Sequence, residues 1–290
     1  MKILISGGSG FLGGAIINKL GVNNKFIILG RTNSNYSRLE NLDHVFYNID
    51  ECNISKIYKK EKPDLVINTA SNYGRANESF TQVVKSNVIY GLELYENAVN
   101  HNVKVFLNID TFLDRNLNIY SLSKAQFRDW LRINKSNTHV INLRVEHIYG
   151  PDHDTNKFTG WLLNKMLYED EIIELTSGEQ KRDFIFIDDL IDLIGILLNQ
   201  YSPNKPYLEM DVGSGHLVTM REFIEKLASM VERETNKNIL DRLGFGKVPY
   251  RINECMHPLL DYSKTKEMGW ESKTTLDLGL ETIVNQILLK

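Results

Sequence analysis

The sequence predicts an α/β protein with a doubly wound parallel sheet, followed by a smaller, mixed α/β lobe. Six short apolar runs alternate with helix-like segments through the first half of the chain. These runs are rich in branched residues and lack polar alternation, as expected for strands buried on both faces of a parallel sheet. The alternation becomes irregular after Tyr149-Gly150-Pro151, which indicates a second lobe.

The predicted strands are Lys2–Ile5, Phe26–Leu29, Val45–Tyr47, Asp64–Asn68, Val103–Leu107 and Val140–Leu143. Helical stretches such as Leu12 to Leu20 and Phe80 to Asn100 separate them. Strands that alternate with helices favour a doubly wound fold, in which ligands bind at the carboxyl ends of the strands.

The domain boundaries follow from the same change of pattern. We expect a first domain over residues 1–149, to which residues 184–206 return as a strand and a helix. The smaller lobe is expected to comprise residues 150–183 and 207–290, where loops rich in glycine and charge appear. Such a lobe would close over the first domain and supply a substrate site.

Composition narrows the classes of partner. The chain has 290 residues and a formal net charge of −3, so no global positive field would attract nucleic acid or anionic lipid. Two cysteines cannot form a disulfide framework, which favours a reducing cytoplasm. The N-terminal apolar run is too short for a signal peptide, and we expect neither a membrane span nor a metal site.

A glycine-rich turn follows the first strand and opens a helix. Gly7, Gly10 and Gly13 give the spacing G-x-x-G-x-x-G in Gly7-Gly8-Ser9-Gly10-Phe11-Leu12-Gly13. Glycines let the backbone turn tightly and approach a pyrophosphate, which then sits at the helix N-terminus. The place of the turn, with five further strands behind it, predicts a Rossmann-type dinucleotide site rather than a tight turn without a ligand.

The end of the second strand distinguishes two cofactors. An acidic residue there would bind the adenine ribose of NAD, whereas an arginine accommodates a 2′-phosphate. The chain reads Arg31-Thr32-Asn33-Ser34, with Arg38 nearby. A guanidinium followed by hydroxyl and amide groups suits a phosphate and favours NADP(H). The alternative is that Arg31 is simply solvated.

Tyr120 and Lys124 lie four residues apart in Tyr120-Ser121-Leu122-Ser123-Lys124, so they share one face of a helix. The ordinary pKa of tyrosine, near ~10, makes it a poor acid–base group at neutral pH. A neighbouring ammonium and a cofactor cation would favour the phenolate and lower that pKa. The pair follows the fifth strand, where it could face a nicotinamide. Because the Tyr-x-x-x-Lys pattern also occurs by chance, a purely structural pair is the alternative.

Thr111 comes directly after the same strand, in Asn108-Ile109-Asp110-Thr111. Its hydroxyl could donate a hydrogen bond to a developing alkoxide while Tyr120 donates its proton. The alternative is a local cap or turn residue. Together these residues predict a site that reduces a carbonyl group or oxidises a hydroxyl group.

With these motifs, the sequence resembles the extended short-chain dehydrogenases/reductases over nearly its whole length. The shared motifs occur in the family's order: the glycine turn, Thr69-Ala70-Ser71, Asn87, Thr111, Tyr120 with Lys124, Leu143-Arg144, Tyr149-Gly150-Pro151, Arg182-Asp183-Phe184, Asp261, Lys264 and Gly269-Trp270. The stretch from Asp110 to Lys124 looks closest to CDP-abequose and CDP-paratose synthases, which reduce the 4-keto group of a CDP-linked 3,6-dideoxyhexose. The chain departs from the broader family in having only eight residues between Thr111 and Tyr120.

The resemblance implies a set of contacts that includes those already expected from the residue patterns and adds others. Cofactor contacts would come from the glycine turn with Phe11 and Leu12, from Arg31, Thr32 and Asn33, from Asp50, from Thr69, Ala70 and Ser71, and from Lys124. Substrate contacts would come from Asn87, Lys157, Phe158, Arg182 and Arg251. The two arginines would hold a diphosphate, although each could be a structural arginine, and Asn87 could be a buried residue that satisfies backbone groups. The resemblance also implies a nucleotide-sugar substrate and a homodimer formed through helices of the first domain.

Three functions remain open. The first is an NADPH-dependent 4-keto-reductase, and the second is an epimerase or 4,6-dehydratase that recycles bound NAD. The third is a non-catalytic NADP sensor. The dehydratase pattern is Thr-Asp-Glu at the end of the fifth strand, whereas this chain has Asp110-Thr111-Phe112. We therefore place the reductase first, the epimerase second and the sensor last.

Overall fold

The computed structural model describes residues 1–39, 44–133, 135–151, 157–200 and 206–288. The chain divides into two compact units. The first unit comprises Met1–Val145 and Ile191–Asp211, and the second comprises Glu146–Leu190 and Val212–Lys290.

The first unit is built on a seven-stranded sheet with the order β10-β6-β5-β4-β1-β2-β3. Its strands are β1 (Lys2–Ser6), β2 (Lys25–Gly30), β3 (Val45–Asn48), β4 (Leu65–Asn68), β5 (Val105–Thr111), β6 (His139–Val145) and β10 (Tyr207–Val212). Neighbouring strands from β3 to β6 pair in parallel. This confirms the predicted α/β class with a Rossmann-type, doubly wound parallel sheet.

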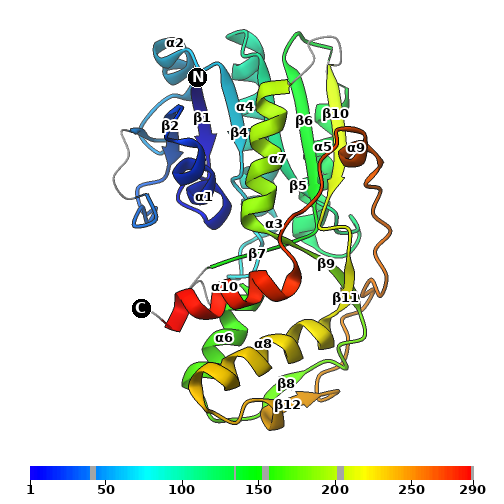
Figure 1. Ribbon diagram of the computed structural model, residues 1–290. Coiled ribbons are helices and arrows are strands. Elements are labelled where there is room, and N and C mark those ends of the chain that lie inside the picture. Colours follow the sequence, from blue (N-terminus) through cyan, green and yellow to red (C-terminus); the bar gives the residue numbers. More distant parts are fainter. Residues whose placement is uncertain (40–43, 134, 152–156, 201–205, 289–290) are drawn as a thin grey trace. The chain divides into compact units, whose positions relative to one another are not determined.

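Helices cover both faces of this sheet, with α1 and α7 on one face and α4 and α5 on the other (Figure 1). The helices are α1 (Phe11–Leu20), α2 (Ile54–Glu61), α3 (Phe80–Val84), α4 (Tyr90–Asn100), α5 (Ile119–Arg132) and α7 (Ile187–Gln200). A π-helical segment, η1 (Lys85–Ile89), joins α3 to α4, so the helix predicted over Phe80 to Asn100 is interrupted. Such π segments often occur at functional sites.

The edge strand β10 belongs to the sheet of the first unit, whereas the sequence-based boundaries placed residues from 207 onward in the second lobe. Acidic side chains break up its apolar pattern, and these accept hydrogen bonds from basic residues of the same unit. Glu209 binds Arg132 of α5, and Asp211 binds Arg144 of β6. An edge strand whose polar groups are paired in this way lacks the continuous apolar run of a central strand.

The second unit is a smaller, mixed α/β lobe. It contains a three-stranded sheet, β11-β9-β7, and a two-stranded sheet, β12-β8. Its strands are β7 (His147–Tyr149), β8 (Ile173–Leu175), β9 (Lys181–Phe186), β11 (Leu217–Thr219) and β12 (Leu243–Phe245). Its helices are α6 (Phe158–Tyr168), α8 (Met220–Thr235), η2 (Leu240–Arg242), α9 (Ser263–Glu267) and α10 (Leu276–Leu288).

The strand predicted to return to the first domain, β9, instead pairs with β7 and β11 in the second unit. The division between the units falls within α7, after Leu190. Aromatic packing accounts for this placement of β9, because the Phe184 ring stacks on Phe223 of α8 with centroids 4.0 Å apart. Tyr149 of β7 also contacts Phe184 edge-to-face.

Within the described ranges, no helix combines the length and the apolar character that crossing a membrane requires.

Candidate active site

The strand order of the first unit reverses at β1. The chain runs outward from β1 to β2 and β3, and then crosses back to β4 on the other side of β1. In doubly wound sheets, ligands bind outside the carboxyl ends of the strands at such a switch point. The glycine turn follows β1 and Thr69-Ala70-Ser71 follows β4, so the topology brings both to this point.

The glycine turn has the close backbone packing that a pyrophosphate site needs. Gly7 has a φ of 79°, and a Cβ there would lie 2.7 Å from the Oγ1 of Thr69 and 2.7 Å from the N of Ala70. A Cβ on Gly13 would lie 2.2 Å from the carbonyl oxygen of Gly7. Gly10 is the N-cap of α1, and it has no side chain to occupy the helix N-terminus. The turn therefore presents backbone, rather than side chains, to a ligand.

The residues predicted to select the cofactor lie at the end of β2. Arg31, Thr32 and Asn33 are exposed. A carboxylate also reaches this point, because β3 pairs with β2 and its following loop carries Asp50. The Oδ2 of Asp50 accepts hydrogen bonds from the N–H and the hydroxyl of Thr32, at 3.0 and 3.1 Å. These two hydrogen bonds hold the pKa of Asp50 below its usual value, and the one from the backbone N–H has the larger effect.

Tyr120 lies in the first turn of α5. A capping box fixes where this helix begins, because the Oδ1 of Asn118 accepts the N–H of Ser121 at 2.9 Å, and the Oγ of Ser121 accepts the N–H of Asn118. The Tyr120 side chain lies beside those of Ser71, which follows β4, and Thr111, at the end of β5, and both of these residues lower the pKa of the Tyr120 phenol. The structure thus brings three of the predicted residues together around one phenol oxygen.

The electrostatics of Tyr120 differ from the sequence-based expectation. Burial raises its pKa well above the usual value, Tyr73 and Asp110 raise it further, and the neighbouring Ser71 and Thr111 oppose this shift. The predicted lowering of this pKa involved Lys124 together with a cofactor cation, and in the protein chain itself Lys124 is not among the groups that shift the pKa of Tyr120. The Nζ of Lys124 donates to the carbonyl oxygen of Ile109 at 2.6 Å. The ammonium is thus directed to the backbone of β5.

Lys124 is almost completely buried, with 1% of its surface exposed. Burial lowers its pKa, as does the nearby Arg128, whereas Asp110 opposes the shift. The pKa of a buried lysine shifts readily when its surroundings change.

The sequence analysis did not single out two residues of the site. The Tyr73 ring lies 4.7 Å from the Tyr120 ring, centroid to centroid, at an interplanar angle of 34°. The guanidinium of Arg75 lies 5.1 Å from the centre of the Tyr73 ring. Tyr73 is 47% exposed, so a partly exposed aromatic ring borders Tyr120, and the Arg75 cation lies against that ring. Their place just after Thr69-Ala70-Ser71, at the carboxyl end of a central strand, could have identified them.

Asn87, predicted to face a substrate, uses its side chain inside the protein. Its Oδ1 accepts the N–H of Asn72 at 2.7 Å, and its Nδ2 donates to the carbonyl of Asn72 and to the Oγ of Ser123, both at 2.8 Å. Asn87 therefore holds the loop that carries Tyr73 against the helix that carries Tyr120. This is the alternative that the sequence left open, a buried residue that satisfies backbone groups.

The remaining predicted substrate residues belong to the second unit. Lys157 is the N-cap of α6, and the Phe158 ring packs against Trp161 and Phe223. The Nη1 of Arg182 donates to the carbonyls of Lys181 and Cys255, at 2.6 and 2.7 Å.

Arg182 also forms an ion pair with Glu254, and its side chain is only 8% exposed. Glu254 closes a turn whose first residue is Arg251, because its N–H donates to the Arg251 carbonyl at 3.1 Å. Arg251 itself is exposed. Arg182 thus supports the turn from which Arg251 projects.

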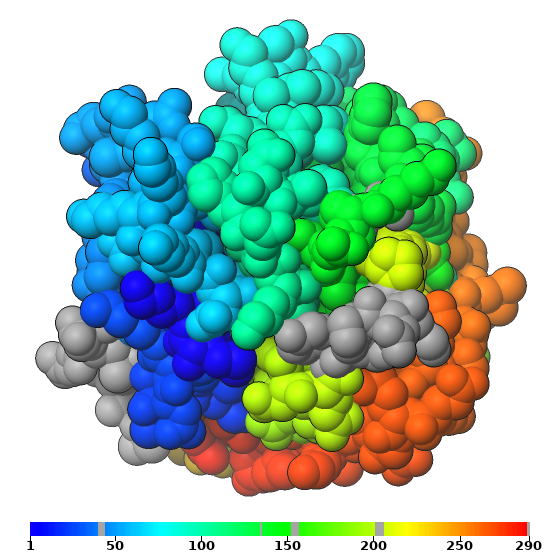
Figure 2. Space-filling view, turned by 90° about the horizontal axis from the view of Figure 1, so that it is seen from above, coloured from blue at the N-terminus to red at the C-terminus, as the bar shows by residue number. Residues whose placement is uncertain are grey.

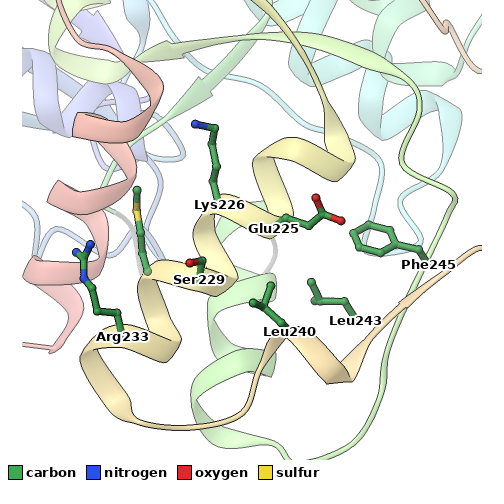
Figure 3. Close-up of a pocket in the computed structure, with 8 residues that line it drawn as sticks. Glu225, Lys226, Ser229, Arg233, Leu240, Leu243 and Phe245 are labelled. Carbon is green, nitrogen blue, oxygen red and sulfur yellow. The ribbon is translucent and has the colours of Figure 1, made fainter.

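A separate hollow of about 590 Å³ lies in the second unit between α8 and β12 (Figure 3). The close-up shows the Glu225 carboxylate pointing toward the Phe245 ring, with Leu240 and Leu243 on the same side. Its Lys226 pairs with Asp277 at 2.7 Å. None of the predicted site residues lines this hollow. Across the described residues, no group of three or more His, Cys, Asp or Glu side chains could hold a metal ion.

A Rossmann-type sheet with a glycine turn at the switch point, and with Tyr120 and Lys124 beyond β5, defines the short-chain dehydrogenase/reductase class. Residues 3–213 match the model of the NAD dependent epimerase/dehydratase family. The chain belongs to this family, and its sequence places it in the extended branch of that class.

Individual relatives are distant but match along the whole chain. CDP-abequose synthase from Salmonella typhimurium is 26% identical over 297 residues, which cover 98% of this chain and 98% of the relative. Among solved structures, a UDP-glucose 4-epimerase from Thermotoga maritima with UDP-glucose is 23% identical, has a TM-score of 0.84 and covers 100% of both chains. A UDP-glucose 4-epimerase from Thermus thermophilus in complex with NAD is 18% identical, with a TM-score of 0.82 and 99% of each chain covered. These structures share the fold of this chain.

Proposed function

We propose that this protein is an NADPH-dependent reductase that acts on the 4-keto group of a nucleotide-linked deoxyhexose in deoxysugar biosynthesis. A CDP-linked 4-keto-3,6-dideoxyhexose is the preferred substrate. The observation that carries the proposal is the position of Tyr120, whose side chain lies beside those of Ser71 and Thr111 at the switch-point edge of the sheet. The full-length similarity to a CDP-abequose synthase supports the choice of sugar nucleotide.

The residues present fit a nicotinamide cofactor, because the glycine turn packs so closely that a Cβ on Gly7 or Gly13 would clash with neighbouring protein atoms, which leaves backbone facing a ligand. Bound NADPH would supply the hydride. Tyr120 is the general acid and donates its phenolic proton to the carbonyl oxygen of the substrate as negative charge develops there. The Thr111 hydroxyl donates a hydrogen bond to the same oxygen. Lys124 completes the site as a buried cation one helical turn from Tyr120.

The position of Asp110 argues against dehydration. A dehydratase needs a carboxyl group that can reach the substrate as an acid. The Asp110 side chain has no exposed surface, and it pairs with Arg128 at 3.0 Å. It therefore faces the interior, and the reductase is favoured over the dehydratase.

The proposed activity is tested with NADPH and a panel of 4-keto sugar nucleotides, by following the absorbance of the reduced cofactor. We expect oxidation of NADPH, with CDP the best competitor among CDP, dTDP, UDP and GDP. Arg251→Ala should weaken substrate binding about tenfold or more while NADPH binding is retained, because a guanidinium–phosphate contact is lost. Arg233→Ala, an exposed arginine of the same unit, is the matched control.

If another nucleotide competes best, the CDP assignment is wrong and the reductase survives. If no 4-keto sugar nucleotide oxidises NADPH, the reductase assignment fails. Interconversion of two sugar nucleotides without net oxidation of the cofactor would then support the epimerase.

The cofactor preference depends on Arg31. We expect NADPH to bind about tenfold or more tightly than NADH, because a charge-assisted contact to the 2′-phosphate is worth roughly 1.5–3 kcal/mol. Arg31→Ala should reduce this difference. Lys25→Ala, an exposed cation at the opposite end of β2, should not. Fluorescence titration of the unmodified protein measures both dissociation constants. Equal values would refute the preference for NADPH and would indicate that Asp50 contributes more than Arg31 to cofactor selection.

We infer further that the protein is a homodimer formed through α4 and α5. Exposed apolar side chains lie along α5 and at its C-cap: Leu122 is 40%, Trp130 53% and the C-cap Ile133 65% exposed. Trp130 and Ile133 also line a hollow of about 470 Å³, whose lining includes Glu96 and Lys135. An apolar surface that carries both an acidic and a basic residue can pair with a second copy of itself, as a twofold contact requires. In Figure 2, cyan and turquoise atoms of the α3 to α4 region form the outer edge of the first unit.

Analytical ultracentrifugation tests the dimer. We expect two copies for the unmodified protein and one for Trp130→Glu, because a charge in the centre of an apolar contact is costly to bury. Leu278→Glu, at a residue of the second unit that is 54% exposed, should leave the dimer intact. A protein that sediments as a single copy before any substitution would disprove this contact.

A further inference from the structure

Three asparagines lie side by side within the core of the main sheet. Asn68 of β4, Asn108 of β5 and Asn142 of β6 occupy the same register, so each faces the next across a strand pair. The Nδ2 of Asn68 donates to the Oδ1 of Asn108 at 3.0 Å, and the Nδ2 of Asn108 donates to the Oδ1 of Asn142 at 2.7 Å. All three are buried. Buried amides among apolar strands are costly unless they are hydrogen-bonded. The presence of these three asparagines, which we call the asparagine ladder, therefore calls for a structural or functional explanation.

The asparagine ladder ends on a charged group. The Nδ2 of Asn142 donates to the Oδ2 of Asp110 at 3.0 Å. A carboxylate only accepts hydrogen bonds, so Asn142 must present its NH₂ group to Asp110 and its carbonyl to Asn108. The same constraint passes along to Asn68. The charge on Asp110 therefore orients every amide of the ladder.

Asp110 and Arg128 together hold both backbone groups of Thr111. The Oδ1 of Asp110 accepts the N–H of Thr111 at 2.7 Å. The Nη1 of Arg128 donates to the Oδ2 of Asp110 at 3.0 Å and to the carbonyl of Thr111 at 3.4 Å. The position of Thr111, and of its hydroxyl, is thus fixed by an ion pair in the interior of the unit.

The same contacts align α5 with the end of β5. Tyr120, Lys124 and Arg128 lie at intervals of four residues and so share one face of the helix. In turn they contact Thr111, the carbonyl of Ile109, and Asp110. Three successive turns of α5 are therefore matched to three consecutive residues of β5.

We propose that Asp110, Arg128 and the asparagine ladder form a positioning unit that holds Thr111 and the Tyr120 face of α5 in register for proton transfer. This rests on the proposed reductase function. Asp110 and Arg128 act through Thr111, Tyr120 and Lys124 and contact no reacting atom. A displacement of about 1 Å at a reacting centre can reduce turnover about a hundredfold, so such a unit has a measurable effect on rate.

The charge of Asp110 also affects the pKa of Tyr120, which a role in packing alone would not do. The groups that act on Tyr120 are Tyr73, Asp110, Ser71 and Thr111. Asp110 raises the pKa of Tyr120, after the larger effect of burial and that of Tyr73. Removing its charge with little change of shape, by Asp110→Asn, should therefore lower the pKa of Tyr120.

The test uses the full-length protein with 3,5-difluorotyrosine incorporated at position 120, so that fluorine NMR follows the ionisation of this phenol alone. We expect Asp110→Asn to move that ionisation to lower pH. In the protein with natural tyrosine, the same variant should lower kcat about tenfold to a hundredfold, with a much smaller change in KM. Glu209→Gln is the matched control, because it breaks the next ion pair along α5, between Arg132 and Glu209 at 2.7 Å. It should change neither quantity.

Arg128 supplies a second variant should Asp110→Asn fold poorly. Arg128→Lys keeps the charge and should retain more of kcat than Arg128→Met at comparable melting temperature. The proposal is overturned if Asp110→Asn shifts neither the ionisation nor kcat, or if Arg128→Lys and Arg128→Met turn over alike. The NMR titration needs no sugar nucleotide. If the protein reduces no sugar nucleotide, the reductase assignment therefore fails. The NMR titration of Tyr120 would still show whether the charge of Asp110 acts on this phenol.

Discussion

Replacing Tyr120 by phenylalanine is expected to reduce turnover about 10²–10⁴-fold, because the general acid is lost. The ring remains in place against Tyr73, 4.7 Å away, so the fold and the cofactor affinity should stay close to those of the unmodified protein. The measurement is kcat with the preferred 4-keto sugar nucleotide, together with the melting temperature and the dissociation constant of NADPH.

Tyr95→Phe is the matched control for this variant. Burial also raises the pKa of Tyr95, and its hydroxyl lies 3.4 Å from the Oγ of Ser136, so a comparable hydroxyl is removed elsewhere in the same unit. Its turnover should stay within about twofold of the unmodified protein, as for most substitutions away from a site. Near-normal turnover by Tyr120→Phe would show that another group donates the proton.

Gly13→Ala is expected to have the second largest effect, on cofactor binding and on stability. The new Cβ would lie 2.2 Å from the Gly7 carbonyl oxygen and 2.9 Å from the Cα of Gly8, both of which are backbone atoms that cannot rotate away. The turn must therefore shift, at a cost of about 1–3 kcal/mol in the free energy of unfolding. Moving the N-terminus of α1 from the pyrophosphate should weaken NADPH binding by more than about tenfold.

The adjacent glycine provides the contrast. A Cβ on Gly14 would meet the Cβ of Arg38 at 3.4 Å, which is an ordinary contact. Because alanine is a better helix former than glycine, Gly14→Ala should be neutral or stabilise the fold by up to about 1 kcal/mol. Chemical denaturation and a fluorescence titration with NADPH distinguish the two variants. If Gly13→Ala matches Gly14→Ala in both, the close approach within the turn is not required.

The features that the sequence predicts well are those with a local signal. Short apolar runs predicted six of the seven strands of the main sheet, and β10 was not predicted because Glu209 and Asp211 interrupt its apolar pattern. The glycine turn was recognisable because its residues are adjacent in the chain and its spacing has a steric cause. The Tyr120 and Lys124 pair was recognisable because one helical turn separates them.

Contacts between distant segments had no such signal. Asp50 reaches Thr32 only because β3 lies beside β2, and nothing near Asp50 in the sequence indicates this. Arg182 carries the residue type of a phosphate ligand, but Glu254, 72 positions later, takes up its guanidinium. The direction of the pKa shift of Tyr120 depends on burial, which spacing does not reveal. Residue type and interval therefore predicted residues that the fold brings together at the candidate site, whereas their hydrogen-bond partners required the three-dimensional fold.

The edge strand β10 has a consequence for how this protein is made. The ribosome releases Met1–Val145 long before Tyr207–Val212 is synthesised, and until then β6 forms the border of the sheet. Its outward N–H and C=O groups are in that period open to pairing with other chains. A fragment that stops near residue 149 would keep this open border permanently, and we expect it to aggregate. Chaperone binding during synthesis should accordingly concentrate between the emergence of β6 and that of β10.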